Sequence, residues 1–290
     1  MNAVVRGLLS PFSVEITPRE TTKLPPLSDL LDPDTAVYVT FLPNVPWEQT
    51  MAAVRWIADA GMRPVPHIAA RGVADRAALR GMLTELAAVG VDQVLLIAGG
   101  MAPVGEYQET VQILDSGCLE EAGIRRVGVA GHPEGHPDVA DDLLTWALAA
   151  KNRIARDRGL DMHLVTQFTF AAQPIVAWER RLRAMGNTLP IHVGLPGVTS
   201  PAKLLKFGLS CGVGPSLKVL RKQTGGVLKL ATTAAYRPET TLLDLAAAIA
   251  ADPRSLLSTV HFFPFGALVA TAEWAYELRA RHTPRSERSA

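Results

Sequence analysis

The chain has 290 residues, of which 48% are hydrophobic, and its formal net charge at pH 7 is +1. This length and apolar content suffice for a large buried core in one or two domains. The balanced charge gives no support to a nucleic-acid or anionic-membrane partner. No apolar run approaches the about 18 residues of a membrane span, and no signal-peptide pattern opens the chain, so we expect a cytoplasmic protein. Cys118 and Cys211 lack metal-ligand spacing and are expected to be free, buried thiols.

Apolar runs typical of strands alternate with amphipathic segments typical of helices along the chain. The expected strands are Phe12–Ile16, Ala36–Phe41, Arg63–Ile68, Gln93–Ala98, Arg125–Ala130, Met162–Phe168, Pro190–Gly194 and Ser258–Phe263. The expected helices are Trp47–Ala60, Asp75–Val89, Asp138–Arg158, Pro174–Met185, Pro201–Leu209, Thr240–Ala250 and Pro264–Arg281. Most of the strands are continuous apolar runs, as in parallel strands that are covered on both faces.

Eight strand–helix units predict an α/β fold, a single (β/α)8 TIM barrel over residues 1–290. We expect frayed ends at residues 1–11 and 283–290 and an extra helix, Pro215–Gln223, before the eighth strand. An open doubly wound sheet is the main alternative. No Gly-x-Gly-x-x-Gly run joins a strand to a helix, which disfavours a dinucleotide-binding sheet.

In a barrel, chemistry belongs to side chains at the carboxyl ends of the strands. The residues expected there are Glu15, Thr40 with Asn44, His67, Gly99-Gly100, His132 to His136, Thr166-Gln167, Leu195 to Gly197 and His261 to Phe265. They are scattered in the sequence, but the barrel would gather them on one face.

Glu15 lies inside an apolar run, where a carboxylate is costly unless it is paired or functional. It is either a strand-end glutamate in a salt bridge, for instance with Arg19, or a general acid with a raised pKa. His67 is either a hydrogen-bonded core group or a ligand-binding one. The Gln167 carboxamide offers a donor and an acceptor, which suits a planar heterocycle. Gly99-Gly100 is either a plain turn or a place where the backbone approaches a ligand.

The loop after the fifth strand holds His132, Pro133, Glu134, His136 and Pro137 within six residues. Proline fixes φ and disfavours helix in the residue before it, so we expect a rigid loop that presents polar groups. The spacing is superficially that of a helical metal site. Pro133 prevents the helix that would place both imidazoles on one face, so we predict no metal.

Several of these motifs, in this order, resemble the methylenetetrahydrofolate reductase family over roughly Phe12 to Glu277. They are Phe12-Ser-Val-Glu-Ile-Thr-Pro, Tyr38-Val-Thr, Pro66-His-Ile, Gly128-Val-Ala-Gly-His-Pro-Glu-Gly-His-Pro, Thr166-Gln-Phe-Thr-Phe, Pro190-Ile-His-Val-Gly-Leu-Pro-Gly and Thr259-Val-His-Phe-Phe. The first, fifth and sixth strand motifs are specific when found together.

The resemblance implies a TIM-barrel oxidoreductase that reduces 5,10-methylenetetrahydrofolate to 5-methyltetrahydrofolate, or runs the reverse reaction in a demethylation pathway. Hydride would pass from NADH or NADPH to bound FAD and then to the folate. Glu15 would be the acid that helps to open the methylene bridge. Gln167, with Phe168 and Phe170, would contact the folate. The cofactor-binding residues would be Thr40, His67, Gly99, Gly100, Ala130, His132, His136, Lys151 and Gln167.

The chain departs from the family pattern beside the expected flavin. Ala98-Gly99-Gly100 stands where the family has Arg-Gly-Asp, His132 replaces a tyrosine, and Lys151-Asn152 replaces an Arg-Lys pair. Direct hydride transfer from nicotinamide without flavin therefore stays open. A folate-dependent barrel methyltransferase and a non-catalytic folate-binding subunit are the alternative functions. The expected partners are a folate and a nicotinamide, without nucleic acid or membrane. A homo-oligomer is an open possibility.

Overall fold

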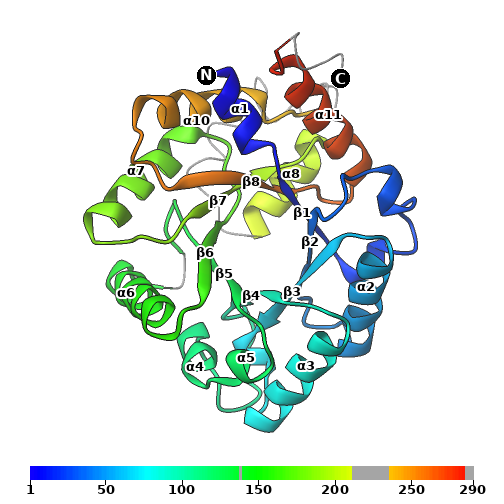
Figure 1. The fold of residues 1–290 in the computed structure, drawn as a ribbon, viewed down its shortest axis with the longest axis vertical. Helices are drawn as coiled ribbons and strands as arrows, with labels where there is room; N and C mark the ends of the chain where they lie inside the picture. The colour runs from blue at the N-terminus through cyan, green and yellow to red at the C-terminus, as the bar shows by residue number, and fades with distance from the viewer. Residues whose placement is uncertain (137–138, 211–234, 285–290) are drawn as a thin grey trace.

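A computed structural model describes residues 1–136, 139–210 and 235–284. Eight parallel strands form a closed barrel in the order β1-β2-β3-β4-β5-β6-β7-β8, and helices surround it (Figure 1). The strands are β1 (Ser13–Ile16), β2 (Ala36–Val39), β3 (Arg63–Ala69), β4 (Gln93–Ile97), β5 (Arg126–Gly131), β6 (Asp161–Thr166), β7 (Ile191–Pro196) and β8 (Leu257–Phe263). The predicted TIM barrel is therefore confirmed, and each strand lies within a few residues of its expected position.

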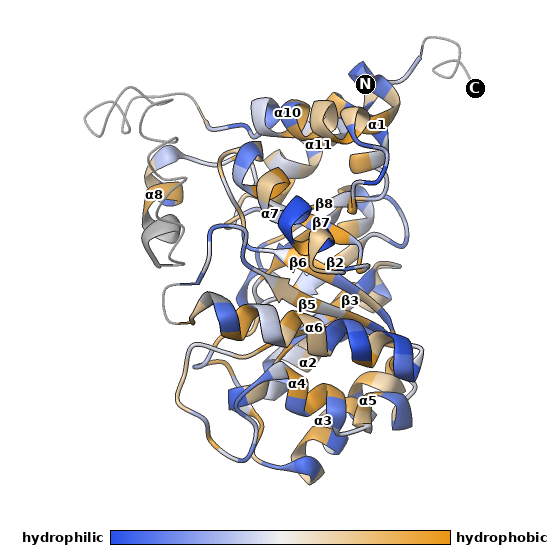
Figure 2. Cartoon of the chain, turned by 90° about the vertical axis from the view of Figure 1, so that its left-hand side faces the viewer, coloured by the Kyte–Doolittle hydropathy of each residue, from blue (hydrophilic) through white to orange (hydrophobic). Residues whose placement is uncertain are grey.

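Helices follow most of the strands and cover the outer face of the barrel. They are α1 (Asn2–Leu8), α2 (Trp47–Asp59), α3 (Arg76–Ala88), α4 (Thr110–Asp115), α5 (Cys118–Glu121), α6 (Asp141–Arg158), α7 (Ala172–Ala184), α8 (Pro201–Ser210), α10 (Glu239–Ala251) and α11 (Leu268–Arg281). The main core fills the layer between strands and helices. Figure 2 shows this pattern, with largely apolar strands and helices that alternate apolar and polar stripes.

The N-terminal segment corrects an expectation. Residues 1–11 were predicted to be frayed, but α1 packs against β8 and α10. Val5, Leu8 and Leu9 are fully or almost fully buried, and Thr259 on β8 donates a hydrogen bond to the Leu8 carbonyl. The apolar residues of this short helix gain more from burial than its chain ordering costs.

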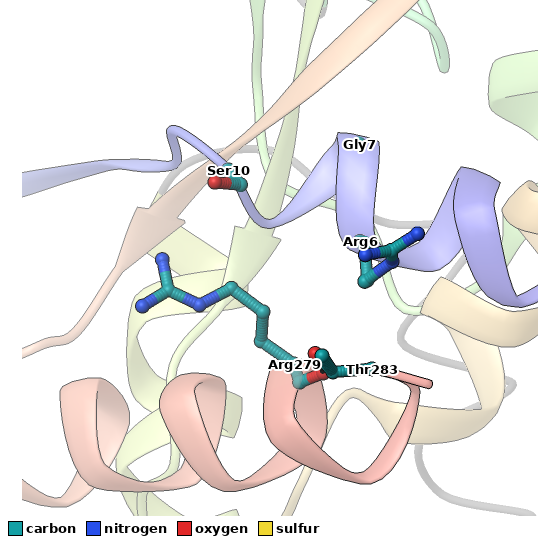
Figure 3. A pocket seen from close by; sticks show the side chains of 5 residues that line it. All are labelled: Arg6, Gly7, Ser10, Arg279 and Thr283. Atoms are coloured by element: carbon teal, nitrogen blue, oxygen red, sulfur yellow. Dashed lines mark hydrogen bonds between the residues drawn. The ribbon is translucent and has the colours of Figure 1, made fainter. Parts of the chain in front are cut away.

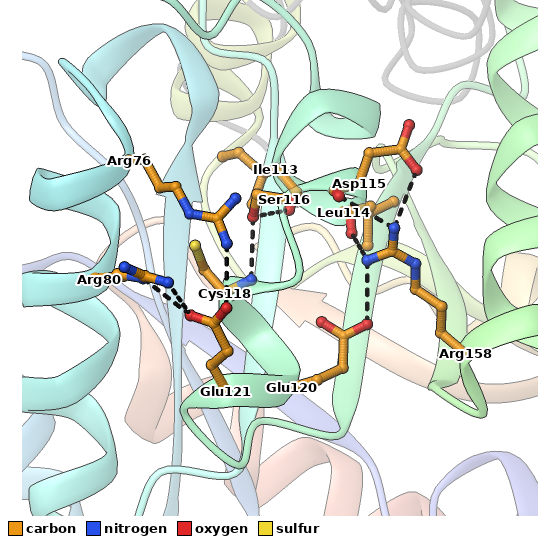
Figure 4. Close-up of polar contacts among 10 residues, drawn as sticks. All are labelled: Arg76, Arg80, Ile113, Leu114, Asp115, Ser116, Cys118, Glu120, Glu121 and Arg158. Atoms are coloured by element: carbon orange, nitrogen blue, oxygen red, sulfur yellow. Dashed lines mark hydrogen bonds and ion pairs between the residues drawn. The ribbon is translucent and has the colours of Figure 1, made fainter.

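Two short helices between β4 and β5, α4 and α5, were not predicted. They join the surface of α3 to the end of α6 through ion pairs (Figure 4). Glu121 bonds Arg76 and Arg80, while Arg158 at the end of α6 donates to the carbonyls of Leu114 and Asp115. Cys118 is free and buried, as predicted. Cys211 and the expected helix Pro215–Gln223 lie outside the described residues.

Candidate functional site

Polar side chains fill much of the barrel interior. The Tyr38 hydroxyl on β2 lies 3.1 Å from Nε2 of His163 on β6 and accepts a hydrogen bond from Gln93 on β4. Because these strands are not neighbours, such bonds can only cross the inside of the barrel. Gly128 makes the room, since a Cβ there would lie 3.0 Å from the His163 Nε2. Barrel interiors are more often filled with branched apolar residues, so this interior is unusually rich in titratable groups.

The centre of the candidate site is Glu15, whose side chain is 13% exposed at the carboxyl end of β1. The Thr40 hydroxyl donates to its Oε1 at 2.7 Å. Its Oε2 lies 3.3 Å from Nε2 of His67 and 3.5 Å from Nε2 of His261. One carboxylate thus receives a hydroxyl and two imidazoles from three other strands or strand ends.

The partners of Glu15 correct two expectations. Its contacts are with Thr40, His67 and His261 rather than with Arg19. Burial alone would raise the pKa of Glu15, but the charge of His67 and the N–H groups of His261 and His67 outweigh burial and hold the pKa below its usual range. Glu15 is therefore an anion in this structure, and the prediction that its pKa is raised is wrong. The sequence shows that the residue is buried but not which groups surround it.

Gln167 and the aromatic residues after it lie at the end of β6. The Gln167 side-chain oxygen accepts a bond from the Phe168 N–H at 3.0 Å, which uses one of its two acceptor positions. Phe168 and Phe170 have no exposed surface. Phe168 packs with Phe263 and Phe265, and Phe170 packs with Phe168 and Tyr236. The direct substrate contact expected of Phe168 and Phe170 does not fit this arrangement. They form a layer behind partly exposed Phe263 and Phe265.

Gly99 and Gly100 follow β4 and are not equivalent. Gly99 has a φ of +92°, which favours glycine, and its carbonyl accepts a bond from Arg71. Gly100 is exposed, and a Cβ there would meet nothing within 4 Å. The turn itself thus requires Gly99, while the surface at Gly100 is open to a ligand.

The loop after β5 gathers His132 and His136, whose rings touch edge to face at 4.9 Å. It is not helical, with Pro133 and Glu134 in a turn. Burial, His136 and Lys151 lower the pKa of His132 to about 4. Burial lowers the pKa of Lys151 to about 8, although Glu109 opposes this shift. His136 and Lys151 disfavour a charge on His132, and a bound anion would relieve that repulsion. Ala130, expected to line the cofactor, lies on β5 opposite Val165 of β6.

The site residues inferred from the sequence did not include Ser13 or Tyr38, and they gave His261 no specific role. The Ser13 side-chain oxygen lies 2.9 Å from Nδ1 of His261, and the Tyr38 ring packs edge-on against His261 at 4.5 Å. Ser13 and Glu15 are two residues apart on one strand and therefore share a face. That alternation was a usable signal for Ser13, and His261 had been noted only as a strand-end candidate.

A hollow elsewhere on the molecule does not belong to this site. A cavity of about 370 Å³ is lined by Arg6, Gly7, Ser10, Arg279 and Thr283 (Figure 3). It lies between α1 and the last turn of α11, at the amino ends of the strands. Arg279 is already paired with Asp32 and stacked on Tyr276. Within the described part of the chain, no three His, Cys, Asp or Glu side chains are grouped to hold a metal ion.

Comparison with known proteins supports the barrel fold. No protein-family model matches the chain. An uncharacterized protein from Clostridium thermocellum, which binds two copies of 5-methyl-5,6,7,8-tetrahydrofolic acid, matches with a TM-score of 0.59 at 10% identity, over 94% of this chain and 99% of that one. A putative phosphonomutase from Burkholderia cenocepacia matches with a TM-score of 0.51 at 12% identity, over 96% of each chain. At these identities the likeness shows the fold alone. Among the described residues, no helix is both long and apolar enough to cross a membrane.

Proposed function

We propose that this protein is a folate oxidoreductase that interconverts 5,10-methylenetetrahydrofolate and 5-methyltetrahydrofolate at the carboxyl end of the barrel, using nicotinamide as the hydride source. The observation that carries the proposal is the buried Glu15 anion held by Thr40, His67 and His261. The resemblance of the strand-end motifs to the methylenetetrahydrofolate reductase family implies that the substrate of this cluster is a folate. The structural neighbour that binds 5-methyltetrahydrofolate supports the choice of a reduced folate.

The opening of the methylene bridge of 5,10-methylenetetrahydrofolate suits a cluster of this kind. The methylene group accepts hydride only after one carbon–nitrogen bond opens to leave an iminium cation. A carboxylate anion in a site with little water stabilises that developing positive charge. The departing nitrogen must gain a proton, and the Glu15–imidazole cluster holds exchangeable protons within 3.5 Å of the carboxylate. The acid role therefore belongs to the cluster rather than to Glu15 alone.

The residues present fit part of a flavin dinucleotide. Lys151, His132 and His136 form a basic group suited to its phosphates, and the Gly100 surface is open. Ala98, Gly99 and Gly100 offer no carboxylate beside a flavin ring. FAD, when bound, would carry hydride from nicotinamide to folate. Direct transfer from nicotinamide to folate is the second route, and the missing carboxylate favours it.

The absorption spectrum of the purified protein, with and without added FAD, separates these routes. A flavin band that NADH bleaches and methylenetetrahydrofolate restores supports the flavin route. A colourless protein that oxidises NADH or NADPH only when methylenetetrahydrofolate is present supports direct transfer. Tight binding of 5-methyltetrahydrofolate without any nicotinamide oxidation contradicts the oxidoreductase proposal and indicates a folate-binding subunit. Methyl transfer to a thiol or corrinoid acceptor without nicotinamide indicates a methyltransferase.

A further inference from the structure

Ser13 is a buried hydroxyl inside the barrel with no role in the mechanism described so far. Ser13 is 5% exposed, and it lies directly opposite His261 in the register between β1 and β8. The Ser13 oxygen is 2.9 Å from Nδ1 of His261. The other ring nitrogen, Nε2, is 3.5 Å from Oε2 of Glu15. The His261 ring therefore bridges two residues of one strand, Ser13 below and Glu15 at the mouth.

The His261 ring is held on all sides. It has no exposed surface, and the rings of Tyr38 and Phe263 pack edge-on against it at 4.5 Å and 4.8 Å. A flip of the imidazole would remove both nitrogens from their partners. The ring orientation is therefore fixed by packing, and only the position of its proton stays to be decided.

The partners decide which nitrogen carries that proton. Glu15 is an anion, so it is stabilised by an N–H at Nε2 and repelled by a lone pair there. Nδ1 is then bare and accepts a hydrogen bond from the Ser13 hydroxyl. A second proton on the ring is disfavoured, since burial lowers the pKa of His261 although Glu15 opposes the shift, and the neighbouring His67 lowers it further.

We propose that Ser13 is a positioning residue that locks His261 as the neutral Nε2–H tautomer, so that the exchangeable proton of the cluster is carried by His67 and Glu15. The titratable groups that face His67 are Glu15 on β1, Tyr38 on β2 and His261 on β8. Only Glu15 among them is an anion.

One proton then follows a defined path during turnover, which rests on the proposed oxidoreductase function. The proton leaves Nε2 of His67, crosses 3.3 Å to Oε2 of Glu15 and passes to the folate nitrogen as its bond to the methylene carbon breaks. That nitrogen gains an N–H, His67 becomes neutral, and Glu15 is again an anion. Solvent then reprotonates His67. His261 keeps its proton throughout and holds the carboxylate in place.

Side-chain ¹H–¹⁵N NMR of the histidines reads the tautomer without any turnover. In the wild type we expect His261 to show the Nε2–H pattern, unchanged across the pH range in which the protein stays folded. Ser13→Ala should mix the tautomers of His261 or let it titrate. Ser258→Ala is the matched control, because this β8 hydroxyl donates only to the Ile191 carbonyl. A wild-type His261 with its proton on Nδ1, or an unchanged tautomer in Ser13→Ala, would overturn the proposal.

Kinetics give a second readout. Ser13→Ala should lower kcat roughly tenfold with KM nearly unchanged, and shift its pH profile, because the step lost is proton transfer rather than binding. Ser13→Thr, which keeps the hydroxyl, should restore the wild-type tautomer and rate. Equal kcat and pH profiles in Ser13→Ala and wild type would overturn the role in turnover. A wild type with no folate turnover refutes the proposed function, while the NMR result still decides the role of Ser13.

Discussion

Glu15 is the residue on which the proposed chemistry depends. Glu15→Gln keeps the shape and hydrogen-bonding capacity of the side chain but removes its charge and its ability to relay a proton. We expect folate binding to stay within a few fold of wild type and folate reduction to fall at least about 100-fold. Binding is measured by calorimetry with 5-methyltetrahydrofolate, and reduction by the 5-methyltetrahydrofolate formed.

The control for this substitution is Glu85→Gln, which changes an exposed carboxylate that only accepts a bond from Trp47. It should leave both measurements unchanged. If Glu15→Gln instead impaired nicotinamide oxidation by a separate electron acceptor and left folate turnover normal, Glu15 would act on the cofactor side and the assigned role would be wrong.

Single residues were predictable where the strand position alone was informative. Glu15, Thr40 and His67 were expected at strand ends, and the structure brings them together. The direction of the Glu15 pKa shift was not predictable, because it depends on which imidazoles face the carboxylate. The contact of Ser13 with His261 depends on the register between the first and last strands, which a local sequence pattern does not contain.

At the scale of elements, long periodic segments were predictable and short ones were not. Helices such as α2 and α3, with 13 residues each, carry several turns of amphipathic pattern. The helices α4 and α5 have six and four residues, too few to show a period. The docking of α1 on β8 and α10 is a tertiary effect, since a seven-residue helix is not stable alone.

The β6–β7 contact depends on a glycine. A Cβ at Gly194 would overlap the carbonyl oxygen of Thr166 and come 2.9 Å from the Phe263 ring. The Gly194 N–H also donates to the Thr166 hydroxyl. Gly194→Ala should therefore lower the free energy of unfolding by roughly 2–3 kcal/mol in urea denaturation.

Gly100→Ala is the control for that substitution, since a Cβ there meets nothing within 4 Å. Its free energy of unfolding should stay within about 0.5 kcal/mol of wild type. Equal stability of the two variants would contradict the close strand approach at Gly194. Weaker cofactor or folate binding by a stable Gly100→Ala protein would support the predicted approach of a ligand to this backbone.

At the scale of the whole molecule, eight apolar strands alternating with helices were enough to predict the barrel. What fills it was harder to foresee, because His163 and His192 stack inside it at 4.1 Å only once the ring of strands has closed. Burial, followed by His261 and nearby arginines, lowers the pKa of His163 to about 4. Burial and His163 lower the pKa of His192 to about 2.

Because His163 is buried and His192 is partly buried, we predict a loss of stability in mild acid. Below about pH 6.5 these imidazoles become protonated in the unfolded chain but stay neutral in the folded barrel. The free energy of unfolding therefore falls as the pH drops. The contribution of these neutral imidazoles to the free energy of unfolding is fully present above pH 6.5. His192→Gln removes one such group and should reduce the loss between pH 6.5 and pH 4 by about 3 kcal/mol. Urea denaturation of the variant and the wild type at a series of pH values measures this difference in the free energy of unfolding.

The control is His282→Gln, which changes a histidine that contacts Asn2 at the chain ends. It should keep the wild-type dependence of stability on pH. Identical pH dependence in His192→Gln and wild type would show that the barrel interior does not hold His192 neutral.

We propose that the barrel mouth around Glu15 reduces a folate. The decisive measurement is the amount of 5-methyltetrahydrofolate formed after anaerobic incubation of the wild-type protein with methylenetetrahydrofolate and NADH or NADPH, with and without FAD. We predict one 5-methyltetrahydrofolate formed for each nicotinamide oxidised in at least one of these mixtures. The proposed function would be contradicted if the protein binds the folate but forms no product in any of these mixtures and also does not oxidise 5-methyltetrahydrofolate in the reverse reaction.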